Sequence, residues 1–241
     1  MPYERLDAAA VIATAERLER RIRARFPDRN LGGVAERLLA VTRDVELIAA
    51  RAQRGRWIRA ASLVLIGLLA VLAVISLVAV LLELAGSAGT TLLWLQAVET
   101  TINDVVFVGV AIAFLWLLPA QLERRRILAE LHRLRSLAHV IDMHQLTKDP
   151  ERFEPGFERT SQTVDIGLRP GQMATYLDYC SELLSLVAKA AALYAEYSTD
   201  PAVLATISDI ENLTNGMSRK IWQKLAMLAN TGARAAADAA D

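Results

Sequence analysis

The chain of 241 residues has little of the chemistry that builds disulfides or metal sites. It contains one cysteine, Cys180, and three histidines, and it has neither a CxxC pair nor a Cys/His cluster. A single thiol cannot form an internal disulfide, and a structural zinc ion takes four ligands. We therefore expect no metal, no other cofactor and a reducing compartment, in which Cys180 is a small core residue.

Catalytic signatures are also missing. There is no G-x-S-x-G nucleophile turn, no Rossmann glycine series and no pair of carboxylates in an apolar setting. Gly32-Gly33 lacks the lysine that a phosphate-binding Walker loop requires. An enzyme is therefore not expected, and no catalytic residue is predicted.

Neither sign of charge is in excess, because 27 Lys and Arg balance 27 Asp and Glu. Aromatic residues are not interleaved with the arginines, so nucleic acid is not an expected partner. Strand patterns are absent, whereas 54% of the residues are hydrophobic and only 22% are charged. This composition is more apolar than that of a typical soluble domain and indicates an all-α membrane protein.

Two long uncharged runs carry the apolar excess. The first covers residues 60–82, which exceeds the roughly 20 residues needed to cross a hydrocarbon core about 30 Å thick. The second covers residues 105–122 and extends back to about residue 103. We predict a transmembrane helical hairpin over residues 57–122, with spans at 60–82 and 103–122 and an outer loop at 83–102.

Arginines lie on one side of both spans and indicate the orientation. The connection between the spans has no Lys or Arg, so the positive-inside rule places both termini in the cytoplasm. The abundance of arginine over lysine suggests a GC-rich bacterial genome, so we expect the membrane to be a bacterial inner membrane. The bilayer is then one partner, because each basic residue near its surface attracts anionic headgroups by about 1 kcal/mol. The basic collar consists of Arg54, Arg56, Arg59, Arg124, Arg125 and Arg126.

Apolar stripes at alternating steps of four and three flank the membrane segment. They are typical of amphipathic or coiled-coil helices. They predict amphipathic helices over residues 1–56 and a stalk helix over 123–147. The two stalk stripes are Val34, Leu38, Val41, Val45, Ile48, Ala52 before the hairpin and Ile127, Leu131, Leu134, Ala138, Ile141, Gln145 after it.

The remainder is predicted to be a loop at 148–171, a cytoplasmic helical hairpin at 172–230 and a disordered tail at 231–241. Within the hairpin, Asp200 is an N-cap and Pro201 is the first helical residue. Together with the stalks, this hairpin gives enough amphipathic helices for an antiparallel bundle.

The outer end of the transmembrane hairpin carries three carboxylates, Glu83, Glu99 and Asp104. Repeated around a symmetric oligomer, they would form acidic rings that concentrate cations at a pore mouth. The simpler interpretation is that they are solvated at the outer interface, and we favour it because both apolar cores lack ionisable side chains.

Polar residues gather where the second stalk ends. His139, Asp142 and His144 are candidates for contact with a ligand or protein partner, and residues 142–150 are dense in polar groups. Alternatively, these groups satisfy the last carbonyls of the helix before Pro150, which is the interpretation we favour. Metal binding is disfavoured, since no HExxH or Glu-x-x-His pair is present.

Two functions are compatible with this pattern. The first is a non-enzymatic, homo-oligomeric scaffold that presents the cytoplasmic helices to a partner protein. A ridge of small residues in the first span (Gly67, Ala70, Ala73, Ser76, Ala79) would allow close packing against a neighbouring helix. The alternative is a small cation channel, or a membrane-permeabilising effector, gated by the cytoplasmic bundle.

Overall fold

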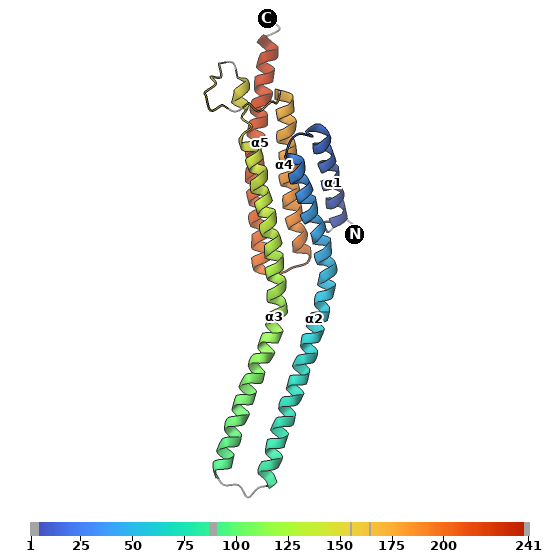
Figure 1. Ribbon diagram of the computed structural model, residues 1–241, viewed down its shortest axis with the longest axis vertical. Helices are drawn as coiled ribbons and strands as arrows, with labels where there is room; N and C mark the ends of the chain where they lie inside the picture. The colour runs from blue at the N-terminus through green and yellow to red at the C-terminus, as the bar shows by residue number, and fades with distance from the viewer. Residues whose placement is uncertain (1–4, 87–90, 155, 164, 239–241) are drawn as a thin grey trace. The chain divides into compact units, whose positions relative to one another are not determined.

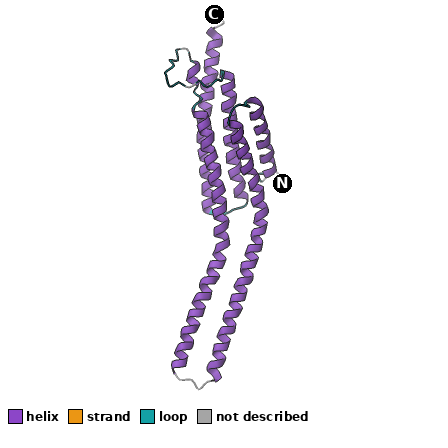
Figure 2. Ribbon diagram, viewed as in Figure 1, coloured by secondary structure: helices purple, strands orange, loops and turns teal. Residues whose placement is uncertain are grey.

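The computed structural model describes residues 5–86, 91–154, 156–163 and 165–238, without the side chains of 46–59, 81, 83–86, 91–97, 100 and 232–238. In these ranges every regular element is helical and no strand is present (Figures 1 and 2). The all-α class is therefore confirmed. The elements are α1 (Ala8–Arg25), α2 (Leu31–Gly86), α3 (Thr91–Leu146), the 3₁₀ helix η1 (Pro150–Phe153), α4 (Pro170–Ala192), the 3₁₀ helix η2 (Leu193–Glu196) and α5 (Pro201–Asp238).

The chain divides into two compact units. Unit 1 comprises Met1–Ala49 and Arg126–Asp241, and unit 2 comprises Ala50–Arg125. Helices α2 and α3 each contribute residues to both units.

Unit 1 is built on the predicted apolar stripes. All of Ile127, Leu131, Leu134, Ala138, Ile141 and Gln145 on α3 are buried. So are the α2 residues Val34, Leu38, Val41 and Val45, whereas Ile48 and Ala52 lie outside the described side chains. Helices α1, α4 and α5 contribute their own apolar faces to the same core. Helical periodicity thus determines which residues exclude water in this unit.

Local signals fix the ends of several helices. The Asp7 carboxylate accepts a hydrogen bond from the Ala9 amide at 3.0 Å at the start of α1. At the start of α5, the Asp200 carboxylate accepts from the amides of Ala202 and Val203 at 2.9 and 3.2 Å. The predicted N-cap at Asp200 is confirmed, and Pro201 is the first residue of α5 because its missing N–H has no partner there anyway.

Carboxylates pair with arginines on the surface of unit 1. Arg21 contacts Glu182 at 3.0 Å and connects α1 to α4. Arg23 bonds to Glu36 at 2.7 Å, and Arg133 bonds to Glu130 at 3.0 Å. Exposed pairs of this kind contribute little stability individually, about 0–1 kcal/mol. They do show that the arginines on this surface have carboxylates within reach.

Unit 2 contains the first membrane-span candidate, Ala60–Val80, and the beginning of the second. The second candidate covers Thr101–Phe153 and continues into unit 1, and the apolar windows of both are unburied. Half-buried residues on α2 follow the steps four, three, four, three, four. We call this stripe the seam with α3, because Ser62, Ala73 and Ser76 on it line grooves together with α3 side chains. The ribbons of the two helices run beside each other here (Figure 1). The seam residues on α2 are Ser62, Ile66, Leu69, Ala73, Ser76 and Val80.

Three boundaries differ from the sequence prediction. Most of the predicted outer loop is helical, because α2 continues to Gly86 and α3 begins at Thr91. Residues 91–102 contain no proline or glycine, so nothing in their sequence stops a helix. The loop at 148–171 includes η1, and α4 begins at Pro170. Helix α5 continues to Asp238, past residue 230 where the predicted hairpin ended.

Candidate functional site

The predicted pore-mouth carboxylates are not alike. Asp104 accepts a hydrogen bond from the Ser76 hydroxyl of α2 at 3.3 Å. Both residues line a groove of about 130 Å³ together with Thr101 and apolar side chains of the two helices. Glu99 is exposed, and the side chain of Glu83 lies outside the described residues. The structure therefore places one carboxylate against the seam of the hairpin, where a polar partner stabilises it.

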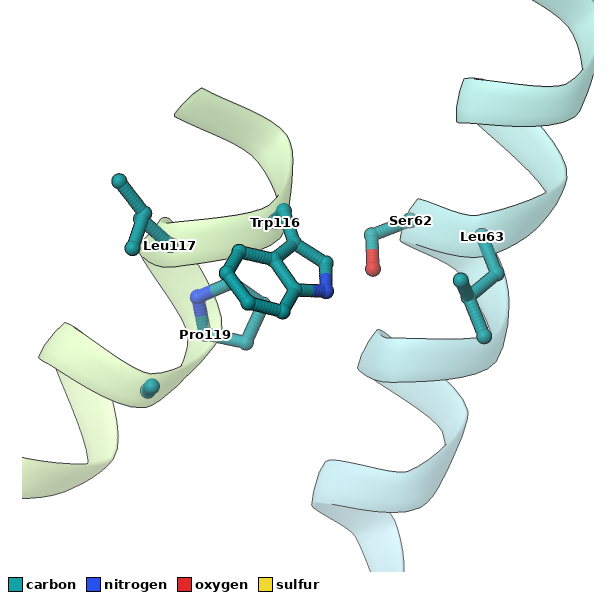
Figure 3. A pocket seen from close by; sticks show the side chains of 6 residues that line it. Ser62, Leu63, Trp116, Leu117 and Pro119 are labelled. Carbon is teal, nitrogen blue, oxygen red and sulfur yellow. The ribbon is translucent and has the colours of Figure 1, made fainter. Parts of the chain in front are cut away.

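A second groove lies nearer the basic collar. It has a volume of about 440 Å³ and is lined by Ser62 and Leu63 of α2 and by Trp116, Leu117, Pro119 and Ala120 of α3. The Trp116 ring points across it toward Ser62 (Figure 3). Of the collar, Arg125 and Arg126 are exposed and Arg124 is half-buried, whereas the side chains of Arg54, Arg56 and Arg59 lie outside the described residues.

The candidate contact residues at the end of α3 divide between surface and interior. His139 is exposed to solvent. Asp142 accepts a hydrogen bond from the Gln145 side-chain amide at 2.6 Å, and His144 Nδ1 lies 3.1 Å from the Tyr176 hydroxyl of α4. Asp142 and His144 thus each take part in a separate side-chain hydrogen bond, and His139 does not share those contacts.

Tyr176 is held in place by aromatic packing. Its ring meets that of Phe26 edge to face, with centroids 5.3 Å apart and an interplanar angle of 73°. Its face lies 5.1 Å from the Lys148 ammonium, within the range of a cation–π contact. Tyr176 therefore positions both His144 and Lys148.

Four cationic residues from separate segments surround this end of α3, and we call them the basic cluster. They are Arg29 from the connection between α1 and α2, Lys148 just after α3, Arg152 in η1 and Lys224 in α5. Lys148 is only 7% exposed. The other three are half-buried, so the cluster reaches from the core to the surface.

Neutral acceptors bind three of these cations, Arg29, Lys148 and Lys224. Lys148 donates to the Thr147 hydroxyl at 2.8 Å, and Lys224 donates to the main-chain carbonyl of Gln145 at 2.8 Å. Arg29 donates to the carbonyl of Ile166 at 2.5 Å. The loop turns at Gly167, which has a φ of 56°. Residues with a Cβ rarely adopt this backbone conformation.

Burial and mutual repulsion shift the titration of these groups. Burial lowers the pKa of Lys148, and the neighbouring charges of Arg29, Arg152 and Lys224 lower it further. Burial and the charge of Lys148 lower the pKa of His144. Burial also lowers the pKa of Lys224, against the attraction of Asp149 and Asp142. The fold thus disfavours the protonated, positively charged forms of Lys148, His144 and Lys224.

Sequence reasoning identified only part of this site. The polar run 142–150 includes Lys148, because local composition marks that stretch. Arg29 and Lys224 are distant in the sequence and carry no local signal. No group of three or more His, Cys, Asp or Glu residues that could hold a metal is found in the part of the chain that the structure describes.

Comparison with protein-family models, with curated proteins and with solved structures gives no match to this chain. Its function is therefore argued from its geometry.

We predict that His144 makes unit 1 less stable in mild acid. Its pKa is lower in the fold than the ordinary value of about 6.5, so the unfolded chain takes up a proton first as the pH falls. The free energy of unfolding should decrease from pH 7.5 to pH 5, and His144→Gln should reduce this decrease. Thermal unfolding followed by circular dichroism at each pH measures this decrease for the wild-type protein and the variant. His139→Gln is the matched control, and an equal effect of both variants would contradict the prediction.

Proposed function

We propose that this chain is a two-pass protein of a bacterial inner membrane that serves as a homo-oligomeric, non-enzymatic scaffold. The observation that carries the proposal is the contrast between the two units. Unit 1 buries a continuous apolar core, whereas the two long apolar helical segments of unit 2 are unburied.

The exposed side chains of unit 2 are too apolar for water. Leu63, Phe107, Phe114 and Trp116 are 60%, 75%, 63% and 70% exposed. Soluble monomers rarely expose continuous apolar patches larger than a few hundred Å². Lipid hydrocarbon removes this cost, and the helices satisfy their own backbone hydrogen bonds there.

The charges favour cytoplasmic termini. No Lys or Arg occurs between residues 60 and 123, whereas arginines lie on both flanks of that segment. Short loops rich in arginine remain on the cytoplasmic side during insertion.

We predict that the hairpin tip is extracytoplasmic. In a Cys180→Ala background, Glu99→Cys should react with a membrane-impermeant maleimide added to intact spheroplasts. Arg135→Cys, at an exposed position of unit 1, should react only after permeabilisation. Labelling is measured by gel shift. Labelling of Arg135→Cys but not of Glu99→Cys in intact spheroplasts, or release of the chain by alkaline carbonate, would contradict the proposed topology.

The hairpin leaves a surface for further helices. Only Ala73 and Ser76 of the small-residue ridge lie on the seam with α3, whereas Gly67, Ala70 and Ala79 are exposed. Small residues allow two membrane helices to approach closely. This arrangement supports self-association through the face of α2 that α3 does not cover.

We predict that the double variant Gly67→Leu, Ala70→Leu shifts the protein toward monomer, because added side chains hold neighbouring helices apart. The mass in nanodiscs, measured by native mass spectrometry, should fall from an oligomer to a single chain. Val71→Leu alters an exposed position that is already large and should keep the wild-type mass. A wild-type protein that is monomeric in nanodiscs would refute the proposed self-association.

One observation favours the cation channel as a second candidate. Asp104 lies at the start of the second candidate span, directly before the uncharged run 105–122, and an ionisable side chain next to the apolar core often marks an ion path. Its bond to Ser76 keeps the carboxylate at the seam between α2 and α3.

If the protein is a channel, liposomes that contain it should show cation flux, and Asp104→Asn should lower the cation-to-anion preference. Glu99→Gln removes an exposed carboxylate before the span and should have a smaller effect. Reversal potentials under a salt gradient measure the preference. Absence of current from oligomeric protein would eliminate this candidate.

A further inference from the structure

We propose that the basic cluster of unit 1 is a binding site for a phosphate group, either free or as part of a phosphorylated ligand or lipid headgroup. The proposal concerns unit 1 alone and does not depend on the scaffold function. It follows from the placement of Arg29, Lys148 and Lys224, the neutral acceptors that hold them and a buried oxygen without a partner at the same place.

Three cations of the basic cluster, Arg29, Lys148 and Lys224, have no carboxylate partner among the described residues. Within the described residues, no carboxylate oxygen lies within 4.0 Å of the cationic nitrogens of Arg29, Lys148 or Lys224. Arginines elsewhere on unit 1 do have such partners, as the Arg21–Glu182 and Arg133–Glu130 pairs show. The fold thus leaves positive charge uncompensated at this place.

Nearby carboxylates are engaged by amide donors. Asp142 accepts from the Gln145 side chain at 2.6 Å, and Asp149 accepts from the Glu151 amide at 3.3 Å. Both attract Lys224, but these two acids stand against the three cations Arg29, Lys148 and Lys224. The formal charge of these five groups is +1, from three positive and two negative charges, which favours a bound anion.

A buried oxygen without a partner lies beside the cluster. Gln145 is 1% exposed, and its Oε1 has no hydrogen-bond partner among the described residues. The assignment of Oε1 is supported by the amide nitrogen, which donates to Asp142. An unsatisfied buried acceptor costs about 1–3 kcal/mol, and a hydroxyl of a phosphate ligand would satisfy it.

The chemistry of the cluster favours phosphate over a carboxylate. Arg29, Lys148 and Lys224 approach from three separate chain segments and do not form one planar pair of donors. A tetrahedral group with three or four acceptor oxygens can bond to donors arranged in this way, whereas a carboxylate is matched best by a single guanidinium fork. Half-buried Arg29, Arg152 and Lys224 give the group a route from solvent to Lys148.

Cys180 provides a reporter of binding in the full-length protein. It is the only cysteine and is fully buried in α4, and burial raises the pKa of its thiol to about 12. A thiol reagent therefore reacts only when unit 1 opens. A ligand that binds the closed form at ten times its dissociation constant reduces the open population about tenfold.

The test compares Cys180 labelling rates in phosphatidylcholine nanodiscs with inorganic phosphate or with sodium chloride at equal ionic strength. A second arm replaces part of the phosphatidylcholine with phosphatidic acid and omits free phosphate, which distinguishes a lipid headgroup from a soluble ligand. We expect labelling to slow about tenfold in at least one arm. Lys148→Met should abolish this protection, and Lys220→Met, at an exposed position on α5, should retain it.

Lys148→Met keeps the buried aliphatic stem, and its labelling rate without phosphate shows whether unit 1 is folded. If that rate equals the rate in denaturant, the Lys148→Met variant is unfolded. The test then uses Lys224→Met in its place. Protection that persists in the folded Lys148 or Lys224 variant would overturn the proposal. So would the absence of protection in both arms for the wild-type protein.

Discussion

The structure depends on how its two sets of apolar side chains are covered. In unit 1 the apolar stripes of five helices cover one another, so the unit removes its own hydrophobic surface from water. In unit 2, α2 and α3 cover only a seam, so most of the leucines, valines and phenylalanines that the structure describes there are exposed. This exposure is what the proposed membrane location would relieve. The pairing of two helices covers the seam between them but does not remove the rest of their apolar surface from water.

Periodicity explains why so much of the fold can be predicted from the sequence. The stripe from Ile127 to Gln145 specifies both a helix and its buried face, because residues three and four apart lie on one side. The uncharged run at 60–82 corresponds to a candidate span at Ala60–Val80 for a similar reason. The outer connection was predicted too long, because the absence of membrane-spanning hydropathy does not stop a helix that has no proline or glycine.

The candidate sites could be predicted only where they are local in sequence. Composition drew attention to Asp142 and His144, and both take part in side-chain hydrogen bonds. The partners that give the site its character are not adjacent: Arg29 comes from a turn between helices, Tyr176 from α4 and Lys224 from α5. Likewise, the Ser76 hydroxyl that bonds to Asp104 is identified only when α2 and α3 are paired. These contacts are created by tertiary packing. A single sequence does not reveal which residues from distant segments will lie next to each other.

Gln145 connects the core of unit 1 to the basic cluster. It occupies the last position of an otherwise apolar stripe, where leucine would bury more hydrophobic surface and leave no unpaired oxygen. Lys148, one turn further, is also buried, and the approach of other cations makes its charge more costly. Two successive core positions are therefore filled by residues that reduce stability in the unliganded fold. A bound anion would reverse both costs, since it supplies the counter-charge for Lys148 and a hydroxyl donor for Gln145.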